Sequence, residues 1–173
     1  VNVWPESSLA ELFSEMGDEE YAKSIARAVV KVRKEHAFVK TLELAEVVRQ
    51  AIPARVCLKR KTHPATKVFQ ALRIAVNDEY GNLERFLEQS VHLLTPGGRL
   101  GVISFHSGED RIVKQFFRRM MKGCDCPPEF PVCVCQKTPK LKNVSRDPIV
   151  ATEREVLENP RSRSAKLRFA ERC

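Results

Sequence analysis

Residues 95–111 constrain the fold of this chain most, because a turn, a short strand and a polar cluster follow one another there. The turn at 96–98, Pro-Gly-Gly, follows a helical pattern that ends at Leu94 and leads into an apolar run over residues 99–105. Four polar side chains come directly after this run: His106, Ser107, Glu109 and Asp110. In open α/β sheets, ligands and chemistry lie at the carboxyl ends of strands. The stretch therefore predicts part of an α/β enzyme.

The bulk composition describes a globular protein with an excess of positive charge. Hydrophobic residues make up 43% and charged residues 30% of the 173 residues, which excludes a disordered chain. No apolar run is long enough to cross a bilayer and no leader pattern opens the chain, so we expect a cytoplasmic protein with no membrane partner. The net charge of +8 fits a nucleic-acid partner. A basic surface without a specific ligand explains the charge equally well.

Residues 1–94 have the apolar spacing of helices. Ser8 and Glu11 form a capping-box pattern for a first helix, a second is expected over about 18–34 and a third over about 41–52. A basic connector follows at 54–67. A longer helical pattern covers 65–94, and Gly81 is the place where it would kink or split.

Residues 99–173 alternate between strand and helix patterns. After strand 99–105 we expect a helix over about 109–122 and a loop over 123–148 that is rich in Pro and Cys. Thr152 and Glu155 form a second capping-box pattern, and residues 165–171 alternate as a half-buried strand with one basic face. The order of these elements favours a three-layer α/β fold that carries a helical insertion.

Several ordered motifs resemble one enzyme family. They are His63-Pro64-Ala65-Thr66, Phe69-Gln70-Ala71-Leu72-Arg73-Ile74, Val76-Asn77, Ile103-Ser104-Phe105-His106-Ser107, Glu109-Asp110-Arg111, Asn159-Pro160-Arg161 and Arg163-Ser164-Ala165-Lys166-Leu167-Arg168. With these motifs the chain resembles the carboxyl-terminal part of the bacterial ribosomal RNA small subunit (16S rRNA) cytosine-N4 methyltransferases, which use S-adenosylmethionine. One departure is Gly108, where the family usually has a large apolar residue, and which predicts a loosened start of the following helix.

The resemblance implies a class I (Rossmann-like) methyltransferase fold with a helical insertion. Residues 1–60 would form the helical insertion subdomain, and 61–173 the carboxyl-terminal half of the methyltransferase domain. Strand 99–105 would pair antiparallel with strand 165–171, and the amino-terminal half of the sheet would be missing from this chain. The glycines agree with a cofactor site outside the chain, because Gly97, Gly98 and Gly101 enter a strand rather than leave one. We therefore expect the fragment alone to be inactive, and aggregation-prone through exposed apolar edges.

The candidate catalytic residues are Ser104, His106, Ser107 and Asp110. They would hold the target amine, or orient groups that hold it, while the base lies unstacked in a pocket. Structural roles remain open beside these catalytic ones. His106 would then cap the following helix, Ser107 would be its N-cap, and Asp110 would favour the helix dipole.

The candidate substrate-binding residues are Arg73, Asn77, Arg111, Arg161, Arg163, Lys166 and Arg168. If the basic clusters share a face, they form a track for RNA phosphates. For Arg73 the alternative is an ion pair with Asp110 or Glu109, and for Asn77 a buried structural hydrogen bond.

Four cysteines form a C-x-C-x6-C-x-C pattern: Cys124, Cys126, Cys133 and Cys135. Four thiolates close a tetrahedral structural zinc site, but reduced thiols without a metal fit the pattern equally well. The function expected is transfer of a methyl group from S-adenosylmethionine to a cytidine N4 in ribosomal RNA, with this chain as the substrate-side part. The alternatives are an RNA-binding module without catalysis and a zinc-stabilised interaction fragment. A homodimer is also left open.

Overall fold

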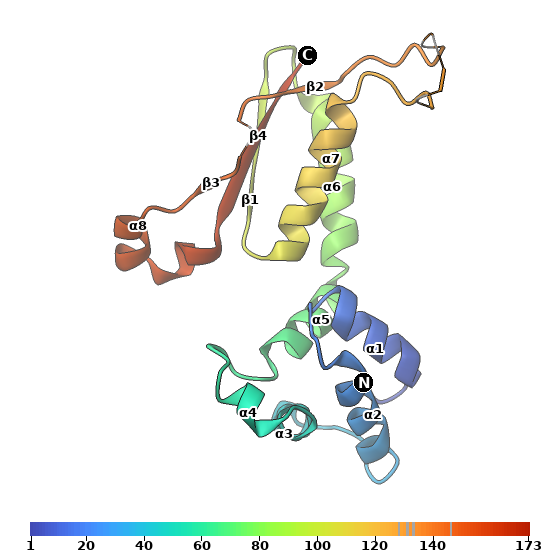
Figure 1. Cartoon of the computed structure of the whole chain (residues 1–173), viewed down its shortest axis with the longest axis vertical. Helices are drawn as coiled ribbons and strands as arrows, with labels where there is room; N and C mark the ends of the chain where they lie inside the picture. Colours follow the sequence, from blue (N-terminus) through green and yellow to red (C-terminus); the bar gives the residue numbers. More distant parts are fainter. Residues whose placement is uncertain (128, 131, 133, 146) are drawn as a thin grey trace. The chain divides into compact units, whose positions relative to one another are not determined.

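The computed structural model describes residues 1–127, 129–130, 132, 134–145 and 147–173 (Figure 1). The chain divides into two compact units, Val1–Glu79 and Tyr80–Cys173. We call them the helical unit and the sheet unit. Each has its own cluster of buried apolar side chains.

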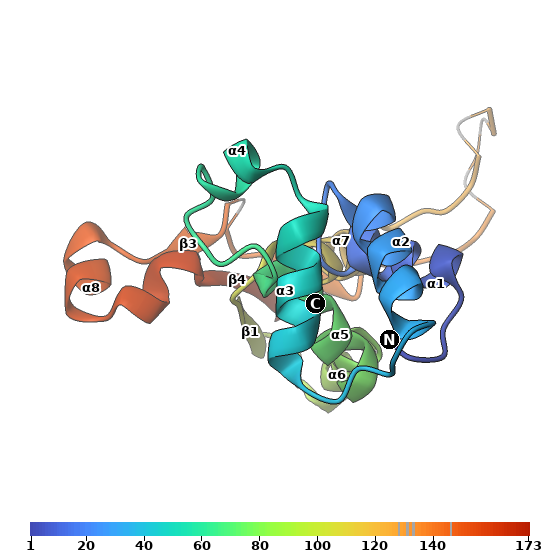
Figure 2. The same cartoon turned by 90° about the horizontal axis from the view of Figure 1, so that it is seen from below.

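The helical unit contains five helices within its described residues: α1 (Glu6–Glu15), α2 (Ala22–Arg33), α3 (Thr41–Ala51), α4 (Ala54–Cys57) and α5 (Thr66–Asn77). Figure 2 shows α2 beside α3, and the two helices are in contact. Phe13, Ile25, Val29 and Val48 are fully buried, because helical spacing places them on the inward faces of their helices. Val68 on α5 joins the same core, so the helical unit extends past residue 60 to Glu79.

Two local details of the helical unit differ from the sequence expectation. The first helix begins at Glu6, ahead of the Ser8–Glu11 capping-box pattern, so that prediction of its start was wrong. The basic connector contains the short helix α4, which no periodicity signalled because it spans a single turn. Arg60 follows this turn and forms a bidentate ion pair with Glu19, with nitrogen–oxygen distances of 2.7 and 2.8 Å. The Glu19 side chain is fully buried, so α4 positions the charge that stabilises it.

The long helical pattern over 65–94 breaks at Asp78 rather than at Gly81. Asp78 has a left-handed backbone conformation with φ of 48°, which ends α5, and Gly81 lies inside the next helix, α6 (Glu79–Leu93). Aspartate tolerates this conformation better than most side chains. The helical pattern therefore breaks at an aspartate, and not at the glycine expected from the sequence.

The sheet unit contains the antiparallel strands β1 (Arg99–Ser104), β2 (Leu141–Asn143), β3 (Ile149–Val150) and β4 (Lys166–Arg172), with α7 (Ser107–Met121), α8 (Glu153–Glu158) and the 3-10 turn η1 (Pro160–Ser164) between them. β4 is central: β1 lies along one side of it, and β2 and β3 pair with it as well. The register joins Arg99 to Glu171 and Ser104 to Lys166, so the predicted antiparallel pairing of these two strands is confirmed.

The two faces of this sheet differ. Helices α6 and α7 lie on one face (Figure 1), where Leu87, Val113 and Phe117 pack against Leu100 and Leu141. The opposite face carries Ile103 on β1 and Ile149 on β3, which are 58% and 53% exposed. The register places both of them beside Leu167 of β4. We call this exposed apolar surface the open face.

The architecture is thus mixed α/β with a small antiparallel sheet, which agrees with the α/β class expected from the sequence. Among the described helices, none has both the length and the hydropathy of a transmembrane segment.

Candidate functional site

The turn from β1 to α7 places His106 at the carboxyl end of the strand. His106 has extended backbone angles and is the N-cap of α7, and its Nδ1 accepts a hydrogen bond of 3.4 Å from the backbone N–H of Glu109. The Glu109 carboxylate in turn accepts a 2.9 Å hydrogen bond from the backbone N–H of Phe105. This reciprocal capping satisfies helix-end donors that would otherwise be unpaired. The capping role considered for His106 is therefore present, and the helix begins with Ser107 directly after it.

The capping bond also fixes what the other ring nitrogen of His106 can do. Because Nδ1 accepts a hydrogen bond, the proton of the neutral imidazole is on Nε2, which is then a donor. Nε2 is buried and lies 3.2 Å from a carboxylate oxygen of Glu109, but it has no hydrogen bond of acceptable geometry to any described residue. A buried donor of this kind is rare in folded proteins, and here a carboxylate oxygen of Glu109 lies next to it.

Tyr80, on α6, packs against the turn from β1 to α7, and the sequence analysis did not identify it. Its ring lies 5.9 Å from the His106 ring, centroid to centroid. A Cβ atom on residue 108 would lie 1.8 Å from the Tyr80 hydroxyl oxygen, so the glycine leaves room for this ring. Gly108 is buried within an intact first helical turn, and the expectation that it loosens the start of the helix was wrong. The signal available in the sequence was Gly108 itself, since a buried glycine often marks a close approach.

Ser104 and Asp110 are both buried and engaged with β4. The Ser104 hydroxyl donates to the Lys166 backbone carbonyl at 3.4 Å. Asp110 forms a bidentate ion pair with Arg168, at 2.7 and 3.1 Å, and lies 3.5 Å from the Lys166 ammonium. The hydrogen bonds from Arg168, and to a lesser extent the charge of Lys166, hold the pKa of Asp110 below its usual value. A carboxylate held in this way joins α7 to β4 and is poorly suited to accept a proton.

Several exposed candidates gather at the same end of the sheet as His106. Lys166 begins β4 and pairs with Ser104 at the end of β1, and the 3-10 turn with Arg161 and Arg163 leads directly into it. Asn159 shapes this turn, because its side chain accepts a hydrogen bond from the backbone N–H of Arg161 at 3.2 Å. Ser107 and Arg111 are exposed on the first turns of α7. Arg161 and Arg163 are exposed as well, as an RNA contact requires.

Arg73 and Asn77 belong to the helical unit. Arg73 forms an ion pair with Glu79, at 2.8 and 3.0 Å, and the side-chain amide of Asn77 donates to the same carboxylate at 3.2 Å. The ion pair of Arg73 is thus made with a carboxylate of its own unit, and the pairing considered with Asp110 or Glu109 stays a prediction. These contacts bridge the backbone break at Asp78, which gives both residues a structural role.

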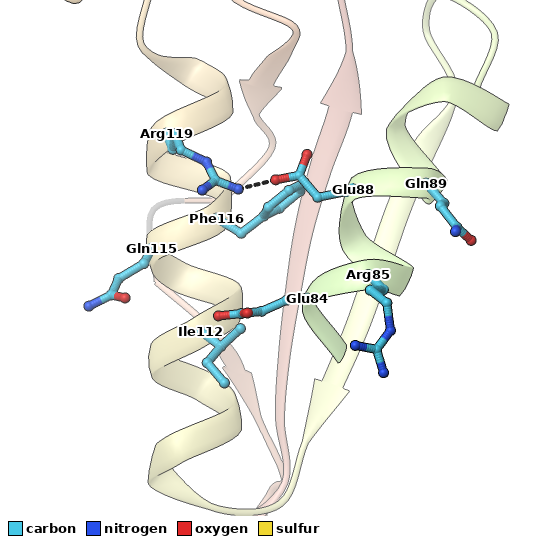
Figure 3. Close-up of a pocket in the computed structure, with 8 residues that line it drawn as sticks. All are labelled: Glu84, Arg85, Glu88, Gln89, Ile112, Gln115, Phe116 and Arg119. Atoms are coloured by element: carbon cyan, nitrogen blue, oxygen red, sulfur yellow. Dashed lines mark hydrogen bonds and ion pairs between the residues drawn. The ribbon is translucent and has the colours of Figure 1, made fainter. Parts of the chain in front are cut away.

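Two clefts border α7. The larger, of about 600 Å³, lies between α6 and α7 and is lined by Glu84, Arg85, Glu88, Gln89, Ile112, Gln115, Phe116 and Arg119 (Figure 3). Arg119 pairs with Glu88 across it, and the acidic and basic side chains balance, so phosphate is not favoured there. The smaller, of about 160 Å³, is lined by Lys114, Phe117, Arg118, Met121, Asn143, Ser145, Arg168 and Phe169. Because no acidic side chain stands among these described lining residues, this second cleft suits an anion.

Comparison with known proteins identifies the family. Residues 1–173 match the pattern that defines the MraW methylase family. The chain belongs to the MraW methylase family. Relatives named ribosomal RNA small subunit methyltransferase H are 52% identical over 172 residues in Carboxydothermus hydrogenoformans and 53% identical over 172 residues in Geobacter sulfurreducens. A relative of the same name in Desulforapulum autotrophicum is 50% identical over 170 residues. The family resemblance predicted from the motifs is thereby confirmed.

The match covers 99% of this chain and 55% of the relatives from Carboxydothermus and Geobacter. The chain therefore spans about half the length of the curated relatives it matches. A methylase needs a methyl donor, and such cofactors are held by glycine-rich turns between a strand and a helix. The glycines near β1 serve other purposes: Gly97 has a φ of 78° in the turn before the strand, and Gly108 makes room for Tyr80.

Proposed function

We propose that this chain is the substrate-side, carboxyl-terminal part of an S-adenosylmethionine-dependent methyltransferase that modifies the N4 amine of a cytidine in small-subunit ribosomal RNA. The observation that carries the proposal is the family match over residues 1–173, together with relatives named as ribosomal RNA small subunit methyltransferases. The position on the base is proposed from the motif resemblance. The cofactor site is assigned to the part of the enzyme that the relatives have beyond the length of this chain.

The fold proposed for the whole enzyme is a class I methyltransferase sheet with the helical unit as its insertion. The open face supports this arrangement, because its exposed Ile103 and Ile149 offer apolar surface to a further layer, and the mainly parallel sheets of doubly wound α/β proteins are covered on both faces. The edge of β1 that does not face β4 has no partner among the described strands, so a further strand can add there. In this arrangement, His106 lies at a strand end, where substrates of such sheets bind.

Methyl transfer to cytosine N4 depends on orientation more than on proton removal. The N4 lone pair is delocalised into the ring, so the nitrogen must be aligned with the methyl group of the donor. His106 orients the base by donating from Nε2 to O2 or N3 of the splayed cytosine. The Ser107 hydroxyl, exposed on the next residue, accepts a hydrogen of the amine. Asp110 acts indirectly, because its ion pair with Arg168 fixes the start of α7 on which both residues sit.

The RNA backbone is bound by the exposed basic side chains near this strand end. Arg161, Arg163 and Lys166 contact phosphates directly, and the small cleft beside Lys114 and Arg118 receives a further phosphate. Arg168 supports this surface through its ion pair with Asp110. Binding of this kind weakens steeply with salt, since each neutralised phosphate releases counterions.

The first test is methylation of small ribosomal subunits by the chain extended to the length of its relatives, with labelled S-adenosylmethionine. The expected product is N4-methylcytidine, identified by mass spectrometry of the digested RNA. A methyl group on another atom would contradict the assigned N4 position. Absence of methyl transfer would contradict the proposed methyltransferase activity. The 173-residue chain alone should bind RNA in a salt-sensitive way and should not bind S-adenosylmethionine. Micromolar binding of S-adenosylmethionine by this chain would refute the assignment of the cofactor site to the rest of the enzyme.

Two substitutions separate the roles of His106. Asparagine caps helices well but places no donor where Nε2 lies, so His106→Asn keeps the start of α7 and removes the contact with the base. We expect methylation to fall on the order of 100-fold in this variant while the melting temperature is unchanged. The matched control is Thr152→Ser, which changes the N-cap residue of α8, away from the proposed contacts with the base and with RNA. Full activity of His106→Asn would leave His106 with a capping role alone.

A further inference from the structure

The loop between α7 and β2 holds three cysteines whose sulfur atoms meet. The Sγ atoms of Cys124, Cys126 and Cys135 all lie within 4.8 Å of one another. The Sγ atoms of Cys124 and Cys135 are 3.8 Å apart. Two thiolates bound to one zinc at about 2.3 Å, in tetrahedral geometry, are about 3.8 Å apart. The sulfur positions thus match the spacing that a metal ion imposes.

Backbone donors point at two of these sulfurs. The N–H of Cys126 donates to Sγ of Cys124 at 3.4 Å, and the N–H of Val134 donates to Sγ of Cys126 at 3.4 Å. Backbone hydrogen bonds of this kind hold the sulfur atoms in place. Metal ligands are commonly oriented by such second contacts. The loop therefore presents its thiols in the arrangement of a ligand set.

Apart from the cysteines, the described contacts of this loop are ion pairs of Asp125 with Lys122 and Lys137 and a few backbone hydrogen bonds. Its ends are fixed, because the N–H of Lys140 donates to the carbonyl of Met120 at 2.8 Å. Between them the apolar side chains of Phe130, Val132 and Val134 are 53%, 70% and 67% exposed, so these described side chains do not form a packed core. Small segments without a core are usually held by a metal or by disulfides. Figure 1 shows the described residues of this segment extending away from α7 and from the sheet.

We propose that Cys124, Cys126 and Cys135 bind a zinc ion that stabilises this loop. Thiolate ligands select soft or borderline cations over magnesium and calcium, which prefer oxygen. Cys133, the fourth cysteine of the sequence pattern, lies outside the described residues. The site is structural, and it is separate in the sequence from the residues proposed to contact RNA.

The test is the metal content of the full 173-residue chain, purified under reducing conditions without chelator. We expect one zinc ion per chain by elemental mass spectrometry, and X-ray absorption should show sulfur neighbours at about 2.3 Å. Cobalt in place of zinc should give the charge-transfer band of a thiolate complex. Cys124→Ser and Cys135→Ser should each lower the retained metal at least tenfold. Cys57→Ser and Cys173→Ser are the matched controls and should retain it.

A second measurement keeps the proposal testable if a variant is unstable. Chelation of the unmodified chain should speed protease cleavage within residues 123–140 at least tenfold, and should leave the helical content unchanged. The proposal would be overturned if the chain contains no metal as purified and its loop still resists protease. It would also be overturned by zinc that persists in Cys124→Ser, or by coordination through nitrogen and oxygen alone.

Discussion

Exposed apolar side chains occur in both units, but they are arranged differently. In the helical unit they are scattered over loops and helices, as with Val39, Leu58 and Val76, around a core that contains the fully buried Phe13. In the sheet unit, Ile103 and Ile149 lie on one face, on either side of Leu167. The helical unit thus closes its own core, whereas the sheet unit is a layer with one face covered. A layer of this kind offers apolar surface on which a further layer of protein can pack.

The two units are alike in another respect, because each contains a buried bidentate ion pair. Glu19 pairs with Arg60 in the helical unit, and Asp110 pairs with Arg168 in the sheet unit. In each case the carboxylate is almost completely buried and the guanidinium is about 15% exposed. Removing one partner leaves a buried charge, so the pairs provide matched probes of the two units.

The largest effect is expected from truncating the carboxylate of either pair. Glu19→Ala and Asp110→Ala should each cost about 3–5 kcal/mol in the free energy of unfolding. Because each pair lies inside one unit, the loss should be confined to that unit. Hydrogen exchange measured residue by residue will show this, with faster exchange in 1–79 for the first variant and in 80–173 for the second. Equal acceleration in both units by either variant would show that they unfold together.

Glycine substitutions should give the next largest effect, and they should differ between the units. A Cβ on residue 17 would lie 2.7 Å from the carbonyl oxygens of Phe13 and Lys67, which are backbone atoms of α1 and α5. A Cβ on residue 108 would meet the far end of the Tyr80 side chain. Backbone cannot move aside as a side chain can, so Gly17→Ala should cost about 3 kcal/mol and Gly108→Ala about 1 kcal/mol.

Urea unfolding of both glycine variants measures this difference. For the sheet unit, a second substitution tests the cause, since Tyr80→Ala should remove most of the cost of Gly108→Ala in a double-mutant cycle. If the two costs simply add, the Tyr80 ring is not the obstacle.

The sequence predicted the elements of the sheet unit better than the contacts between them. Strand 99–105 and its antiparallel partner at 165–171 follow from local apolar patterns, and the structure has both. Asp110 and Arg168 meet because the register sets Ser104 against Lys166, and no local pattern encodes that register. The strands β2 and β3 are too short for a local pattern to predict, and they form because they pair with β4.

The candidate site shows the same division between local and distant information. His106 was identified from its place after a strand, which is a local signal. The role of Tyr80 depends on packing across two helices, which a single sequence does not display. For Arg73, the break at Asp78 brings Glu79 into ion-pair distance, a local contact that the sequence analysis did not predict.

Acid should weaken both units by a smaller amount, through the same carboxylates. Burial alone would raise the pKa of Glu19, but hydrogen bonds from Arg60 and Tyr21 together bring it below its usual value. Hydrogen bonds from Arg168 lower the pKa of Asp110. A carboxyl with a depressed folded-state pKa contributes stability above its unfolded pKa, near 4, and loses it as the pH falls through the folded value.

Each unit of that difference in pKa is worth about 1.4 kcal/mol. Unfolding free energies measured from pH 6 down to about pH 2 should therefore decline for the unmodified chain. In Asp110→Asn the decline should be smaller for the sheet unit and unchanged for the helical unit. A decline unaffected by Asp110→Asn would assign the acid sensitivity to other carboxyls.

The smallest effect should come from the open face, and it tests the comparison between the units most directly. Ile103→Thr keeps a β-branched residue at an exposed strand position, so it should change the free energy of unfolding of this chain by less than about 0.5 kcal/mol. Leu100→Ala, on the covered face of the same strand, should cost about 2–4 kcal/mol and serves as the control. If the open face packs against the rest of a longer enzyme, Ile103→Thr should cost more than 1 kcal/mol in the chain extended to the length of its relatives, because a buried Ile then loses apolar contacts and gains a hydroxyl. An equally small effect in both chains would mean that the open face stays exposed, and the sheet unit would then be complete as it stands.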